Sequence, residues 1–243
     1  MTFTDSGNDE LSLASPLTGG SGSPKKPSPS SYPARTPEMD LRIAKHESGH
    51  ICCGKAFGFP VAFATIVPTD GYGGMVSANA DRSFLATPDH VADLCAKVRP
   101  LMPQVGQPRI DAAEFYTHAH FRIIVLLAGT ESERLFHTAD PPLQANHDLE
   151  EAKVFAAIIC SPAAVPAFIE FGKAEARAIL DDHRHIALAL ARALVANRTL
   201  DGDQIDSVIS DAVFAKAIDN EHLRRAEWQR TIANSGTYKV NKT

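Results

Sequence analysis

Apolar residues recur at helical intervals along most of the chain, and one short region has the composition of β-strands. From residue 36 the spacing predicts a helix that continues to 56 and ends before Gly58 and Pro60. From residue 110 onward the spacing is helical almost to the end of the chain. It predicts helices over about 111–136, 146–160, 173–197 and 201–232, joined by a loop at 137–145, a short irregular or helical connection at 161–172 and a turn at 197–202.

Two segments rich in β-forming residues follow the first predicted helix, at 61–67 and 72–78. The turn residues at 68–71, Pro-Thr-Asp-Gly, separate them, so we expect a hairpin or a small sheet beside the first helix. A further helix is expected over 88–99 and a loop over 100–109. The predicted fold class is therefore mainly α, with one small sheet in an α+β arrangement.

The two ends of the chain differ in composition from the region between them. Ser, Pro and Gly supply 17 of the first 35 residues, a composition that buries too little apolar surface to offset its conformational entropy. We expect residues 1–35 to be a disordered linker or solubilising tail, with a docking segment for a partner as the alternative. A single domain is predicted over 36–232. It is expected to begin at residue 36 because Thr36 and Pro37 are typical of the start of a helix. Residues 233–243 are predicted to be a polar tail.

Composition and charge narrow the classes of function. The chain has 243 residues, of which 44% are hydrophobic and 22% charged, and a net charge of −5, which excludes a collagen-like, coiled-coil or wholly disordered chain. The negative balance argues against nucleic-acid binding. The longest apolar stretch, 123–129, is far shorter than the roughly twenty residues of a membrane span. Residues 1–5 lack the basic start and apolar run of a secretion signal, so we expect a cytoplasmic protein without membrane contact.

The four cysteines do not follow a pattern typical of disulfides or of a zinc knuckle. Cys52 and Cys53 are adjacent, and no CxxC pair forms with Cys95 or Cys160. A chain of this length can bury a core without disulfide bonds. We therefore expect four reduced and partly buried thiols.

The segment 46–50 reads HESGH, which matches the HExxH pattern of zinc sites. His46 and His50 are one helical turn apart, so both imidazoles leave the same face of the helix and can bind one zinc ion. Glu47 lies beside the open coordination position, where a carboxylate can accept a proton from water activated by the metal. The alternative is a pair of surface histidines, but the motif lies inside a well-capped helix in which Gly49 permits close packing.

A zinc site of this kind needs a third protein ligand. The extended pattern HExxHxxGxxH does not supply it, because Cys53 and Ala56 stand at its last two positions. The remaining candidates are downstream histidines and carboxylates, namely His118, His120, Glu131, Glu133, Asp140, His147 and Asp148. His118 and His120 lie on different faces of their predicted helix, which disfavours both as ligands. His147 is disfavoured because it would point away from its neighbour.

Five motifs, in the same order, resemble the peptidase domain of FtsH-type, membrane-anchored ATP-dependent zinc proteases. They are the segment 43–50 around HExxH, the strand pair 65–68 and 73–76, the helix segment 127–136, the Asn-His-Asp-Leu segment within 146–152 and the closing helices within 178–205. The similarity extends over about 36–212. It implies a mainly helical zinc-peptidase fold for this part of the chain.

The resemblance also implies an activity, that of a zinc metalloendopeptidase acting on unfolded or extended polypeptides. Its zinc ligands would be His46, His50 and Asp148. Glu47 would be its general base. Asp148 falls in the first turn of a predicted helix, where a carboxylate is favoured. Glu133 would support the site by accepting a hydrogen bond from a ligand histidine, with an ordinary surface charge as the alternative.

The substrate of such a peptidase would lie extended and add to the second predicted strand. The residues expected to contact it are Gly73, Gly74, Met75 and Val76, although Met75 and Val76 are equally consistent with a place in the core.

The chain departs from the family in two respects. It contains no phosphate-binding GxxxxGKS or GxxxxGKT motif and no ATPase or membrane segment before the peptidase region, so we expect no ATPase activity of its own. The region 81–110 is enlarged, so the substrate groove is expected to be partly covered. The expected partners are a polypeptide substrate and either a separate ATPase or further copies of the chain. The alternative function is a catalytically weak or inactive zinc-binding regulatory module.

Overall fold

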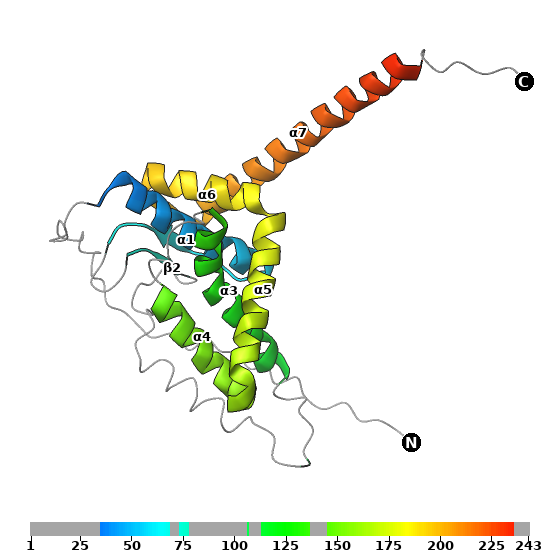
Figure 1. The fold of residues 1–243 in the computed structure, drawn as a ribbon. Coiled ribbons are helices and arrows are strands. Elements are labelled where there is room, and N and C mark those ends of the chain that lie inside the picture. The colour runs from blue at the N-terminus through cyan, green and yellow to red at the C-terminus, as the bar shows by residue number, and fades with distance from the viewer. Residues whose placement is uncertain (1–34, 69–72, 78–105, 107–112, 137–144, 236–243) are drawn as a thin grey trace, which may run out of the picture. The chain divides into compact units, whose positions relative to one another are not determined.

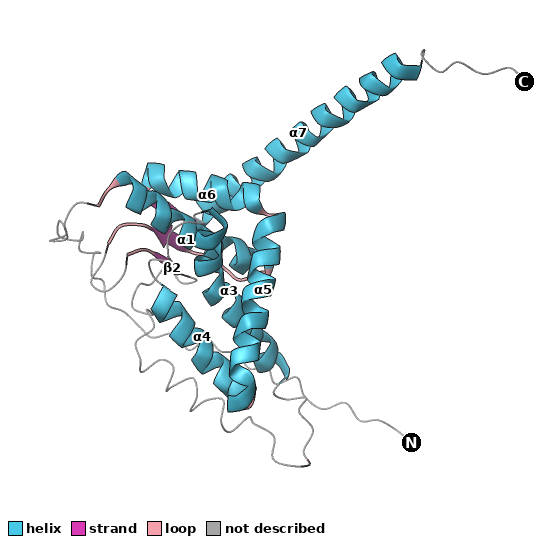
Figure 2. Cartoon of the chain, viewed as in Figure 1, coloured by secondary structure: helices cyan, strands magenta, loops and turns pink. Residues whose placement is uncertain are grey.

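The computed structural model describes residues 35–68, 73–77, 106, 113–136 and 145–235. Most of these residues lie in helices (Figure 1). The described residues all belong to one compact unit. The helices are α1 (Pro37–Ala56), α3 (Ala113–Phe136), α4 (Ala145–Ile159), α5 (Val165–Asp182), α6 (Arg184–Asn197) and α7 (Gly202–Ser235), with the short 3-10 helix η4 (Pro162–Ala164). The strands, shown in magenta in Figure 2, are β1 (Phe63–Thr65), β2 (Met75–Ser77) and β3 (Thr199–Asp201). The predicted class, mainly α with one small sheet, is confirmed.

The first helix begins and ends where its sequence predicts. The Thr36 hydroxyl accepts a hydrogen bond from the Met39 amide at 3.2 Å, which satisfies one of the free N–H groups of the first turn. Acidic side chains in that turn favour the positive end of the helix dipole. After Ala56 the chain turns at Gly58, whose φ of 76° is a conformation that glycine adopts without strain.

The small sheet has three antiparallel strands in the order β2-β1-β3. Ala64 in the central strand lies opposite Val76 on one side and Leu200 on the other. The first two strands are the predicted pair. The third corrects the prediction of a turn at 197–202, because only Arg198, at a φ of 66°, has turn geometry there. A third strand was missed because its partner β1 lies far away in the sequence, and only burial of Leu200 against the core brings the two together.

The prediction of one helix over 173–197 is also wrong. Helix α5 begins already at Val165, within the predicted connection, and ends at Asp182, and His183 separates it from α6. The break follows from packing, since α5 lies mainly against α3 whereas α6 lies mainly against α1. Each helix buries its own apolar face, so a continuous helix would leave one of the two faces without a neighbour.

Helices α1 and α3 form the centre of the domain. One apolar cluster joins α1 to the sheet, α6 and the start of α7, and a second joins α3 to α4 and α5. A glycine makes the contact between α1 and α3 possible. A Cβ atom at Gly49 would lie 2.5 Å from the Ala128 carbonyl oxygen and 2.6 Å from the Ser132 Cβ, so a larger residue would push the helices apart. The HExxH segment thus lies in the buried contact between α1 and α3.

Several predicted features fall outside the described residues. They are most of the tail 1–35, the turn residues 69–71, the helix over 88–99 and, apart from Gly106, the loop over 100–109. Helix α7 continues to Ser235, past the predicted end at 232. Among the described helices, none combines the length and the hydropathy needed to cross a membrane.

Candidate metal centre

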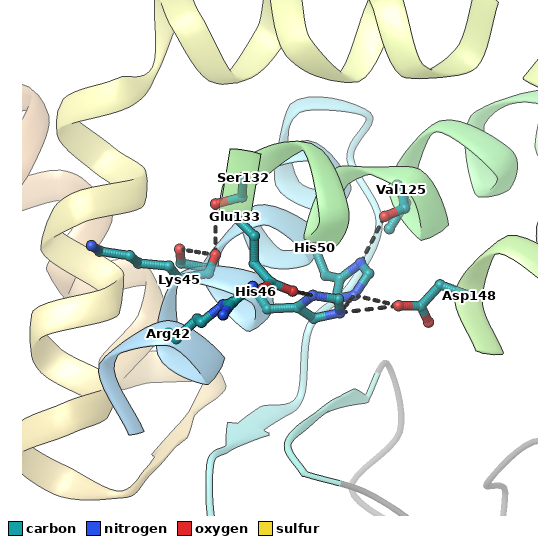
Figure 3. Close-up of polar contacts among 9 residues, drawn as sticks. Arg42, Lys45, His46, His50, Val125, Ser132, Glu133 and Asp148 are labelled. Carbon is teal, nitrogen blue, oxygen red and sulfur yellow. Dashed lines mark hydrogen bonds and ion pairs between the residues drawn. The ribbon is translucent and has the colours of Figure 1, made fainter. Parts of the chain in front are cut away.

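The two histidines of the HExxH segment project from α1 toward Asp148, which lies in the first turn of α4 (Figure 3). The Nε2 atoms of His46 and His50 are 3.0 Å apart. Asp148 Oδ2 lies 3.0 Å from His46 Nε2 and 3.4 Å from His50 Nε2. One ligand atom from each residue therefore lies within 4.8 Å of the other two, and this group could hold a metal ion.

The other ring nitrogen of each histidine has its own partner (Figure 3). His50 Nδ1 donates a hydrogen bond to the Val125 carbonyl oxygen at 2.7 Å, and His46 Nδ1 donates to Glu133 Oε1 at 2.7 Å. Because these acceptors place one proton on each Nδ1, the neutral form of each ring presents a lone pair on Nε2. With both rings neutral, two lone pairs and a carboxylate oxygen face one another, an arrangement that a proton or a metal cation stabilises. Two imidazoles with one carboxylate are also a common donor set for catalytic zinc.

A second ionic contact fixes the carboxylate that holds His46. Glu133 is almost fully buried, and its Oε2 accepts a hydrogen bond from Arg42 Nε at 2.9 Å. Arg42 stands one helical turn before His46 on α1, so both side chains reach Glu133 from the same face. Sequence reasoning missed Arg42, although its spacing of four residues from the first histidine is a visible signal. The guanidinium compensates the burial of the Glu133 charge.

The charges around the site favour a positive ion at its centre. Burial alone lowers the pKa of His46, but hydrogen bonds to Asp148 and Glu133 outweigh burial and raise this pKa to about 10. Burial raises the pKa of Asp148, but the imidazoles of His50 and His46 outweigh burial and hold this pKa well below its usual range. A group of side chains that attracts a proton this strongly also attracts a metal cation, which competes for the same lone pairs.

Glu47 is buried beside the two histidines. Burial raises its pKa, while the charges of His46 and His50 act in the opposite direction. A Cβ atom at Gly74 would lie 2.5 Å from Glu47 Oε1, so the backbone just before β2 runs directly against this carboxylate. A side chain at this position would displace the carboxylate. The structure therefore places the end strand of the sheet next to the HExxH helix.

A glycine on α3 also lies against the two imidazoles. A Cβ atom at Gly129 would lie 2.5 Å from the Nε2 of His46 and 2.5 Å from the Nε2 of His50. The space between the two histidines therefore exists only because residue 129 has no side chain. Gly129 belongs to a motif of the resemblance, but its spacing alone did not indicate this contact.

The four predicted substrate-binding residues have different environments. Gly74 lies against Glu47, and Gly73 is half-buried. Met75 is buried, and Val76 is partly buried and packs against the core. Of the two roles that the sequence left open for Met75 and Val76, these environments match a place in the core.

Among the described residues, the other candidate ligands lie outside the metal group. Glu131 is buried but pairs with Arg134 and Arg177, whose Nε is 3.1 Å away. His118 is exposed near Phe59, and His120 lies among the rings of Phe121, Phe168 and Phe171. His147 is exposed, and Asp140 lies outside the described residues.

Comparisons with known proteins do not place the chain in a family. No protein-family model matches the sequence, and no curated protein matches it either. The resemblance to FtsH-type peptidase domains therefore stays a prediction carried by the motifs themselves. The metal centre is supported by the positions of its own residues.

Proposed function

We propose that this chain is a zinc metallopeptidase that cleaves unfolded or extended polypeptides. The observation that carries the proposal is the convergence of His46 Nε2, His50 Nε2 and Asp148 Oδ2 beside the buried carboxylate of Glu47. Three protein ligands of this kind leave one coordination position open, which is the arrangement of catalytic rather than structural zinc. A metal site built only for stability needs no buried carboxylate next to it.

Each residue of the site has a role in peptide hydrolysis. A zinc ion bound by the three ligands would polarise the scissile carbonyl and make water more acidic. Glu47 accepts a proton from the attacking water as the new C–O bond forms, and it delivers that proton to the leaving nitrogen as the C–N bond breaks. Glu133 and the Val125 carbonyl hold the two imidazoles in the orientation that metal binding requires.

The position of the sheet supports an extended substrate. β2 is an end strand, and the backbone at Gly74 runs against Glu47. A peptide that adds to this edge by main-chain hydrogen bonds would bring its carbonyl groups close to the Glu47 carboxylate. Main-chain recognition also suits an enzyme of unfolded chains, because it depends little on the side chains of the substrate.

The test is a comparison of the wild-type chain with E47Q, using a reduced and alkylated protein as the unfolded substrate. We expect E47Q to retain one zinc per chain but to lose cleavage about 100-fold or more, because the proton acceptor is gone. E175Q is the matched control, since Glu175 is an exposed carboxylate on α5 far from the motif in sequence. Equal cleavage by E47Q and the wild type would contradict the mechanism.

The same assay separates the peptidase from the alternative of a zinc-binding regulatory module. Wild-type protein that carries a full complement of zinc but cleaves no unfolded substrate would support the module. Adding a separate ATPase would then show whether cleavage depends on threading of the substrate. Wild-type protein that binds no metal would contradict both functions.

A further inference from the structure

The two halves of the long helix α7 differ in burial. Its first turns pack on the core through the buried Ile205 and partly buried neighbours at 208, 209 and 212. From 213 to 235 almost every residue is exposed, and Figure 1 shows this half extending away from the other helices. Large apolar side chains are nevertheless exposed on it, namely Val213, Phe214, Ile218, Leu223, Trp228 and Ile232. Rows of exposed apolar residues mark surfaces that bind a partner.

Four of these apolar residues lie on one face of the helix. The face consists of Phe214, Ile218, Glu221, Arg225, Trp228 and Ile232, which we call the α7 stripe. Its members are alternately four and three residues apart, the spacing of helices that pair along a common seam. At about 100° per residue, the stripe lies about 180° around the helix from Ile205. It therefore points away from the core on which the first turns of α7 pack.

The α7 stripe is symmetric about residue 223. Phe214 and Ile232 are equally far from this centre, as are Ile218 and Trp228, and as are Glu221 and Arg225. If a second α7 lay antiparallel on the first, each member of the stripe would face the residue of the second copy that is equally far from 223 on the other side. Phe214 would face Ile232, Ile218 would face Trp228, and Glu221 would face Arg225. The two pairs of apolar residues would then lie on each side of a centre in which each Glu221 faces an Arg225. A self-complementary surface of this kind is what a two-fold symmetric interface requires.

We infer that α7 pairs antiparallel with α7 of a second copy of this chain and so forms a symmetric dimer. The pairing uses residues 214–232 and involves none of the metal-site residues. It buries the apolar ends of the α7 stripe, which a single copy leaves exposed to water. A hollow lined by Ala217, Ile218, Glu221, His222 and Arg225 lies at the level where Trp228 of the second copy packs.

The central charges select the antiparallel orientation. In a parallel pair each Glu221 would face a second Glu221 and each Arg225 a second Arg225, which is repulsive. Within one chain Glu221 Oε1 is already 2.6 Å from Arg225 Nε. A guanidinium has five N–H donors, so Arg225 can bind its own Glu221 and that of the second copy together. Arg224 also binds Glu221 of its own chain, with its Nε 2.7 Å from Oε2, so two carboxylates and four guanidinium groups form one network at the centre of the dimer.

The proposal is tested on the full chain by measuring its mass in solution and its tryptophan fluorescence over a dilution series. Trp228 is the one tryptophan of the sequence, so the emission reports on this surface alone. We expect a dimer at high concentration, and on dilution a conversion to monomer with a red shift of the emission as Trp228 becomes exposed. For the variants described next, far-UV circular dichroism checks that the domain remains folded.

Charge reversal tests the orientation. E221R and R225E each create like-charged central layers, and each is expected to weaken dimerisation about 100-fold. The double variant E221R/R225E restores opposite charges in an antiparallel pair only, so it should dimerise like the wild type. L223A is the matched control, because Leu223 is 63% exposed on the same helix but on the opposite face. It should leave the dimer unchanged.

Three outcomes would overturn the proposal. The first is a wild-type chain that stays monomeric at about 100 μM, a concentration well above the dissociation constant expected of a specific pair. The second is a dimer that L223A weakens as much as E221R, or that the double variant fails to restore. The third is a blue shift of Trp228 that requires phosphatidylcholine–phosphatidylglycerol vesicles, which would assign the surface to lipid. Zinc content and cleavage are independent of all three results.

Discussion

Glu133 Oε1 lies 2.7 Å from His46 Nδ1, although the two residues are 87 positions apart and belong to different helices. Arg42 holds the other oxygen of this carboxylate. The orientation of the first histidine of the motif is therefore determined by α3 and by the turn of α1 that precedes it. This relationship and the other contacts of the site lead to three predictions, and the burial of two cysteines on α1 leads to a fourth.

Replacing Glu133 should weaken metal binding without removing a ligand. E133Q cannot carry the charge that keeps His46 correctly oriented, and loss of such a partner reduces metal affinity about 10- to 100-fold. Zinc affinity measured by competition with a chromophoric chelator checks this. E150Q is the control, because Glu150 is an exposed carboxylate that pairs with Lys153 on α4. Unchanged affinity in E133Q would show that the charge of Glu133 has no effect on metal binding.

An alanine at position 129 should abolish metal binding. Its Cβ would lie 2.5 Å from both Nε2 atoms, where the metal must approach. The matched control is G54A on α1, where a Cβ would have Val61 Cγ2 as its nearest neighbour at 4.0 Å. Because alanine favours a helix over glycine by roughly 1 kcal/mol, G54A should bind zinc normally and be at least as stable as the wild type. Zinc content and thermal unfolding of both variants distinguish a blocked site from a general loss of fold.

Removing the metal should lower the thermal stability of the domain. The three ligands come from α1 and α4, which both pack on α3, so an ion that joins them stabilises the arrangement of these three helices. At free zinc a thousandfold above its dissociation constant, the stabilisation is about 4 kcal/mol. For a chain of this size this corresponds to a melting temperature about 10 °C higher with zinc than with a chelator. The variant H50A should melt at the same temperature under both conditions.

The two adjacent cysteines should resist alkylation in the native protein. Burial raises the pKa of the Cys52 thiol to about 12 and that of Cys53 further still. At pH 8 a thiol of pKa 12 is ionised in about one molecule in ten thousand, and the thiolate is the form that reacts. Mass spectrometry after treatment with iodoacetamide should find Cys160, which is half-buried, modified before either of them. Rapid labelling of Cys52 would show that α1 opens from the core.

Local patterns predicted the elements that depend on nearby residues. The N-cap of α1, its end before Gly58 and the first two strands follow from short-range chemistry, and the structure has them where the sequence places them. The predictions of one helix over 173–197 and of a turn at 197–202 were wrong. The break at His183 and the strand at Leu200 depend on which distant elements pack against these residues. Helical spacing alone cannot show where one packing partner replaces another.

The sequence by itself determined that His46 and His50 lie one turn apart on a helix with Glu47 between them, because helical geometry fixes the spacing of neighbouring residues. Only the tertiary structure decided that Asp148 Oδ2 meets the two imidazoles, that Arg42 and Glu133 hold one of them, and that Gly129 leaves room at their centre. These contacts join residues that are far apart along the chain. Their distances are set by how α3 packs against α1 and how α4 packs against α3, and long-range packing has no local signature in the sequence.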